Sequence, residues 1–114
     1  MFGLPADFDP AFLVGKELES ASFGQTVLNL HLSGSTLIRI ECTISGDNKE
    51  AESLPGSILL VYPLIGFSIR SASSQRDGTL FLQFENDKTL RIYDSNARYE
   101  SYHILKEDGT TLVV

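Results

Sequence analysis

Histidine is the side chain that most often moves protons near neutral pH, and this chain of 114 residues has only two, His31 and His103. His31 alternates with Leu30 and Leu32, so it points away from the apolar face of a predicted strand. His103 stands in the strand-like segment YESYHI. Because no nucleophile motif accompanies either histidine, we expect each to be a surface or cross-strand residue rather than a catalytic base.

The single cysteine, Cys42, is the next candidate nucleophile. It follows Ile38 and Ile40 in the same phase of a predicted strand, which favours a small buried hydrophobe. Arg39 and Glu41 fall in the opposite phase, so neither is expected to activate the thiol. One cysteine excludes an internal disulfide, and one cysteine with two scattered histidines does not form a zinc site.

Carboxylates stand two residues apart at Glu17 and Glu19, and again at Glu50 and Glu52. Such a pair on one strand face could act as acid and base. Nothing apolar surrounds them in the sequence to shift a pKa, so a solvated strand face is the better interpretation. The chain also lacks a phosphate-binding glycine loop and a serine elbow. We therefore expect no enzyme activity, no cofactor and no metal.

Composition is that of an ordinary globular protein, with 42% hydrophobic and 21% charged residues. The net charge of −6 disfavours binding to nucleic acid or to an anionic membrane, because phosphates would be repelled. The longest apolar run, residues 58–65, contains Pro63 and is too short to span a bilayer. Residues 1–14 lack the basic start of a signal peptide, so a cytoplasmic location is expected.

The chain contains two copies of one unit. The aligned segments are 13–22 with 64–73, at a spacing of 51, and 28–42 with 80–94, at a spacing of 52. Nine of the 25 aligned positions are identical. Self-similarity of this kind indicates that one supersecondary unit is used twice. We place the repeats at about 12–44 and 63–94, each a three-stranded meander introduced by a short apolar segment and a glycine.

Alternation of apolar and polar residues predicts the strands of the two repeats. They are residues 16–23, 26–32, 37–44, 67–74, 79–85 and 88–93. The predicted inner faces consist of Leu28, Leu30, Leu32, Ile38, Ile40, Leu80, Leu82, Phe84, Leu90 and Ile92. For the inner residues of paired strands to face each other, the hairpin loops must contain three or five residues. We expect positive φ at Gly34 in the first loop and at Asn86 or Asp87 in the second.

Two short helical segments and a closing hairpin complete the predicted fold. Asp9 followed by Pro10 is typical of a helical N-cap and first turn. Residues 57–62 could form a buried strand or a short helix, and we favour the helix by analogy with the first repeat. Strands at 99–105 and 110–114 flank the Asp108-Gly109 turn signal. The fold class is thus mainly β, or α+β at the margin, in a single domain of about eight strands over residues 1–114.

The outward phase of the second repeat suggests an interaction surface. The candidate partner surface consists of Phe81, Gln83, Arg91 and Tyr93, extended by Tyr99, Glu100 and Tyr102. Aromatic residues and arginine are the types that anchor protein interfaces. The alternative is that the short helices or a second copy of the chain cover this stripe, which would make it core or dimer interface.

The succession LIGFSIRSA, DGTLFLQFENDKTLRI and YESYHI resembles a group of small bacterial proteins of unknown function with tandem β-meanders and a YES[YW]-x-I close. Some members of such groups are similar to immunity proteins that accompany toxins. The resemblance covers roughly residues 12–114, although Asp87 stands where glycine is usual. It implies the meander fold and a protein partner, and it assigns no catalytic residues.

Three functions follow from these observations. The favoured one is a non-catalytic protein-binding module, of the kind that inhibits a toxin. The second is a structural protein that associates with itself as a homodimer. The third is an enzyme or small-ligand binder with a site between the two repeats.

Overall fold

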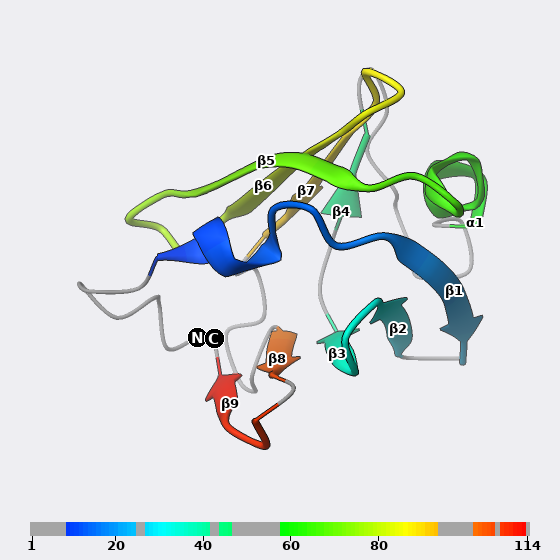
Figure 1. Cartoon of the computed structure of the whole chain (residues 1–114). Helices are drawn as coiled ribbons and strands as arrows, with labels where there is room; N and C mark the ends of the chain where they lie inside the picture. Colours follow the sequence, from blue (N-terminus) through cyan, green and yellow to red (C-terminus); the bar gives the residue numbers. More distant parts are fainter. Residues whose placement is uncertain are drawn as a thin grey trace.

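The computed structural model describes residues 9–24, 27–41, 44–46, 58–93, 102–106 and 108–113. In these residues the chain forms two antiparallel sheets (Figure 1). One sheet has five strands in the order β1-β2-β3-β8-β9, and the other has four in the order β4-β7-β6-β5. The mainly β fold class is confirmed.

The two meanders have the same register. The first consists of β1 (Leu18–Phe23), β2 (Leu28–Leu32) and β3 (Thr36–Ile40), and the second of β5 (Ile69–Ser74), β6 (Leu80–Phe84) and β7 (Thr89–Ile92). Leu18 pairs with Leu32 as Ile69 pairs with Phe84, and the register of each pair of strands shifts by one residue immediately afterwards. All ten predicted inner-face residues are buried in one apolar core, because successive side chains of a strand point to opposite faces.

The hairpin loops have the predicted length. Leu32 pairs with Thr36, and Phe84 donates its amide to the Lys88 carbonyl at 2.8 Å, so each loop has three residues. Gly34 and Asp87 have positive φ, of 74° and 66°, as expected. Ser35, the counterpart of Asp87, also has positive φ, which the sequence did not indicate.

The two repeats join through reciprocal backbone hydrogen bonds. The Gly15 amide donates to the Ile69 carbonyl and the Gly66 amide donates to the Leu18 carbonyl, each at 2.8 Å. Gly15 corresponds to Gly66 and Leu18 to Ile69 in the alignment, so the two bonds are related by an approximate twofold axis. Both glycines have φ near +90°, a conformation that costs other residues energy. The residues at the beginning of the predicted strand 16–23 form such hydrogen bonds with the other repeat, so β1 starts only at Leu18.

Chain that follows each three-stranded meander pairs with the other sheet. The predicted strand 37–44 is wrong in its second half: β3 ends at Ile40, and β4 (Ile44–Ser45) pairs with β7 in the other sheet. Conversely β8 (Tyr102–Leu105) follows the second repeat and pairs with β3. The four-stranded sheet is thus completed by the end of the first repeat, where Ile44 lies opposite Ile92, and the five-stranded sheet by chain that follows the second repeat, where Tyr102 lies opposite Ile40.

Short helical turns introduce both repeats, as predicted. In η1 (Pro10–Leu13) the Asp9 carboxylate accepts a hydrogen bond from the Ala11 amide at 2.9 Å. In the second repeat α1 (Ile58–Val61) runs into η3 (Tyr62–Leu64), so the helical interpretation of 57–62 is confirmed for these residues. Leu60 of α1 packs so close to Gly46 that a Cβ there would lie 3.0 Å from Leu60 Cδ2.

The closing hairpin is confirmed over its described part, where β8 pairs with β9 (Thr111–Val113) at the edge of the five-stranded sheet. Figure 1 shows η1 beside β5 of the other repeat. Among the described residues, no helix is both long and apolar enough to cross a membrane.

Candidate functional site

The outer side of the four-stranded sheet carries four of the predicted surface residues. We call Phe81, Gln83, Arg91 and Tyr93 the Arg91 face. One row across the sheet consists of Ser73, Phe81, Arg91 and Ser45, and a second row consists of Ser71, Gln83 and Thr89. The Arg91-face residues alternate with core residues and are half-buried. The structure therefore brings these four predicted residues together, because β6 and β7 are adjacent.

Phe81 and Arg91 form the centre of this face. They lie directly opposite each other on β6 and β7, and the guanidinium carbon of Arg91 lies 4.7 Å from the centroid of the Phe81 ring. An arginine in this position is attracted to the face of the ring. In the described part of the chain no carboxylate lies within 4.0 Å of Arg91, so the guanidinium retains donors for another molecule.

Hydrogen bonds hold the other two residues of the Arg91 face. The Ser71 hydroxyl donates to the Gln83 side-chain carbonyl at 3.3 Å. The Tyr93 hydroxyl lies 2.8 Å from the Ser45 hydroxyl of β4. Because Ser45 belongs to the first repeat, the strand that crosses between the sheets positions Tyr93, and no local pattern around Tyr93 could have indicated this.

Tyr102 does not lie on the predicted partner surface. It has no exposed surface, lies on β8 in the other sheet and donates its hydroxyl to the Gly78 carbonyl at 2.7 Å. Alternation alone does not indicate whether Tyr102 or His103 faces the core, because the partner strand of β8 could not be known from the sequence. Tyr99 and Glu100 lie outside the described residues.

The corresponding face of the five-stranded sheet is chemically different. Asn29 stands where Phe81 stands in the second repeat, so Arg39, the counterpart of Arg91, has no ring beneath it. Arg39 instead approaches Glu41, with 4.0 Å between Nη2 and Oε1, and half of its side chain is exposed. The two faces have the same strand pairing, but among the described residues only the second has an arginine over a Phe or Tyr ring.

The structure adds one residue pair that the sequence reasoning missed. Ser22 Oγ lies 3.1 Å from His31 Nε2, because β1 and β2 are neighbours and bring together residues nine positions apart. A serine and a histidine at this distance are the first two parts of a hydrolytic triad. Both are exposed, and within the described segments no carboxylate hydrogen-bonds His31 to orient it, so the pair lacks the third part.

The remaining catalytic candidates stay apart. His103 lies on β8, separated from the strand of His31 by β3, so strands spaced about 4.8 Å apart place the two histidines at least roughly 9 Å apart. Glu17 and Glu19 flank buried Leu18 and are both exposed. No three His, Cys, Asp or Glu side chains in the described residues are grouped to hold a metal ion. Cys42, Glu50 and Glu52 lie outside the described residues.

Comparison with protein-family models, with curated proteins and with solved structures finds no match to this chain.

Proposed function

We propose that this protein is a non-catalytic protein-binding module that docks its partner on the Arg91 face. The observation that carries the proposal is the Arg91–Phe81 stack, 4.7 Å from guanidinium carbon to ring centroid. A stacked arginine has already lost much of its side-chain freedom, so less entropy is lost when it binds. Arginine and aromatic residues are also the common energetic anchors of interfaces.

The chemistry of the Arg91 face specifies the kind of partner. The guanidinium offers donors to a carboxylate, while the Phe81 ring and the Gln83 amide offer apolar and polar contact beside it. The partner is therefore a protein whose surface presents an acidic residue next to an apolar one. The resemblance to immunity-like proteins suggests a toxin as this partner, in the cytoplasm of a bacterium, and a toxin bound here would be inhibited by occlusion.

Self-association of the Arg91 face is the less favoured alternative. In a twofold dimer centred on this face the two Arg91 side chains would approach each other, and like charges at an interface are repulsive. The net charge of −6 on each copy adds to the repulsion.

The test uses the purified full chain and the product of the adjacent gene, the first candidate toxin, with affinity measured by titration calorimetry. Arg91→Ala and Phe81→Ala should each weaken binding by at least about tenfold, the effect typical of an anchor residue. Arg39→Ala is the matched control, because Arg39 is the counterpart of Arg91 on the other sheet, and it should change the affinity less than about twofold.

Several outcomes would contradict the proposal. Equal losses for Arg39→Ala and Arg91→Ala would show that the Arg91 face is not the docking surface. If the adjacent gene product does not bind, the full chain is used to capture proteins from a lysate of the source organism, and only a protein released by Arg91→Ala but not by Arg39→Ala supports the module. A doubled mass in sedimentation that Arg91→Ala abolishes would instead establish the homodimer.

A further inference from the structure

A small cavity lies where the first helical turn meets one end of the five-stranded sheet. It has a volume of about 160 Å³ and is lined by Phe12, Lys16, Thr36, Lys106 and Asp108. Phe12 belongs to η1, Thr36 begins β3, and Lys106 directly follows β8. The cavity therefore exists only because β8 pairs with β3, and it lies apart from the Arg91 face, which is on the other sheet.

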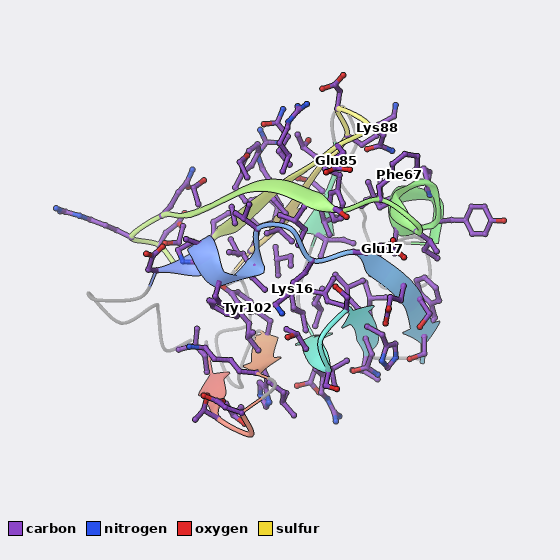
Figure 2. The ribbon with its side chains drawn as sticks, viewed as in Figure 1. Lys16, Glu17, Phe67, Glu85, Lys88 and Tyr102 are labelled. Atoms are coloured by element: carbon purple, nitrogen blue, oxygen red, sulfur yellow. The ribbon has the colours of Figure 1, made fainter. Side chains whose placement is uncertain are left out.

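Two ammonium groups give the cavity its charge. Lys16 Nζ makes one long contact, 3.5 Å from the Ser33 carbonyl oxygen, and Figure 2 shows the Lys16 side chain at the centre of the molecule, directed toward the lower sheet. Lys106 Nζ lies 4.5 Å from the centroid of the Phe12 ring. In the described ranges no carboxylate forms an ion pair with either lysine, although the protein as a whole is acidic.

The carboxylate of Asp108 is already engaged. Its Oδ1 accepts hydrogen bonds from the Thr110 hydroxyl at 2.6 Å and the Thr110 amide at 2.9 Å. Those bonds lower the pKa of Asp108 below its ordinary value of 3.8, and the carboxyl is ionised at neutral pH, as an ordinary aspartate also is. The described residues of the lining thus hold two positive charges and one negative charge, which leaves a net charge suited to a ligand with a single negative charge.

A buried hydroxyl without a partner supplies an independent indication. Thr36 is only 3% exposed, and among the described residues its Oγ1 has no hydrogen-bond partner. Buried polar groups in proteins are nearly always hydrogen-bonded, and an exception calls for an explanation such as a ligand. Thr36 lines the cavity, but its Oγ1 has almost no surface open to solvent, so a ligand oxygen accepts a hydrogen bond from this hydroxyl once the side chain turns toward the cavity.

We infer that this cavity is a binding site for a small carboxylate with a short apolar tail. The carboxylate lies between the Lys16 and Lys106 ammonium groups and accepts from Thr36 Oγ1, while the tail lies against the Phe12 ring. At about 30 Å³ for each water-sized group, the cavity accommodates roughly five such groups, so a four- or five-carbon acid fills it. Inorganic phosphate fits less well, because its second negative charge would face Asp108.

The second repeat has no equivalent site. Pro63 and Phe67 stand at the positions of Phe12 and Lys16, and Lys88 stands at the position of Thr36. Figure 2 shows Phe67 and Lys88 toward the upper sheet, away from Lys16. One ligand per chain is therefore expected.

The test is an NMR titration of the ¹⁵N-labelled full chain with sodium butyrate at constant ionic strength. Amides of the cavity should shift with a single saturable site and a Kd on the order of 1 mM, as expected for a ligand of so few atoms. Butyramide, which has the same shape without the charge, should bind at least about tenfold more weakly. Inorganic phosphate should also bind more weakly than butyrate.

Variants test each side chain. Lys16→Gln and Thr36→Val should each weaken butyrate binding, Lys16→Gln by about tenfold, whereas Thr36→Ser retains the hydroxyl and should retain most of the affinity. Asp108→Asn should strengthen binding severalfold, because it removes the opposing charge. Lys88→Gln, in the β6–β7 turn, is the control lysine and should have no effect.

Any of five results would overturn the inference, four of them from the titrations with butyrate, butyramide, phosphate and Lys16→Gln. These are the absence of saturable shifts at about 50 mM butyrate, equal binding of butyramide, tighter binding of phosphate, or undiminished binding by Lys16→Gln. A loss of affinity in Asp108→Asn would also overturn it, since an anion should gain affinity there. The fold of each variant is checked by its unperturbed amide spectrum away from the cavity.

Discussion

The buried hydroxyl of Tyr102 ties β8 to the β5–β6 turn, and its removal should measurably destabilise the protein. The hydroxyl donates to the Gly78 carbonyl at 2.7 Å, and both residues are buried. Tyr102→Phe keeps the ring in the core but leaves this carbonyl without the hydroxyl. An unsatisfied buried acceptor costs about 1–3 kcal/mol, so we expect a loss of about 2 kcal/mol in the free energy of unfolding.

Urea denaturation followed by circular dichroism measures this loss. With an m-value of roughly 2 kcal/mol per molar urea for a domain of this size, the midpoint should fall by about 1 M. The melting temperature should fall by about 8 °C, at roughly 4 °C per kcal/mol. The m-value itself should be unchanged, because the surface exposed on unfolding stays the same.

Tyr62→Phe is the matched control, because the same hydroxyl is removed from a side chain that is 73% exposed. Its effect should stay within about 0.5 kcal/mol. If Tyr102→Phe and Tyr62→Phe unfold at the same urea concentration, the hydrogen bond to Gly78 contributes nothing and the reasoning is refuted.

Two further predictions concern the backbone hydrogen bonds between the repeats and a turn carboxylate. Gly15→Ala and Gly66→Ala should each lower the free energy of unfolding, measured with urea, by about 1 kcal/mol. The loss should come from backbone strain alone, because φ is positive and a Cβ would meet no atom within 4 Å. A stabilised variant would contradict this. Thr110→Val should raise the pKa of Asp108 toward 3.8 in an NMR pH titration, because the Thr110 hydroxyl is the largest cause of its lowering. A carboxyl whose pKa is lower in the folded than in the unfolded protein stabilises the fold above the unfolded-state pKa, and this stability is lost as the pH falls through the folded-state pKa. Thr110→Val should therefore destabilise the protein more at pH 6 than at about pH 2. An unchanged pKa of Asp108 in this variant would contradict the assignment.

The hairpins could be read from the sequence because their signals are local. Alternation along five residues decides which side chains of a strand face inward, and the position of Ser33, Gly34 and Ser35 between facing inner residues decides the loop length. The same reasoning placed Phe81 and Arg91 on one outward face, since both lie within one hairpin. The N-cap at Asp9 is equally local, because the carboxylate caps an amide only two residues away.

Local patterns in the sequence do not predict the candidate ligand cavity or the burial of Tyr102. Each depends on β8 pairing with β3, residues more than 60 positions apart in the chain. Alternation says that Tyr102 and His103 face opposite sides, but it does not say which side is covered. Lys16 and Lys106 come together only through the same pairing.

The amino-acid sequence by itself determined the strands, the turns, the two repeats and the composition of the core, because these follow from steric preferences and apolar periodicity over a few residues. Only the tertiary structure decided which strands complete each sheet, that β4 and β8 cross between the repeats, and which polar groups meet. An unpaired strand edge is satisfied equally well by any strand with free amides and carbonyls. The choice among partners is made by the packing of the whole core, in which Ile44 meets Ile92 and Tyr102 meets Ile40.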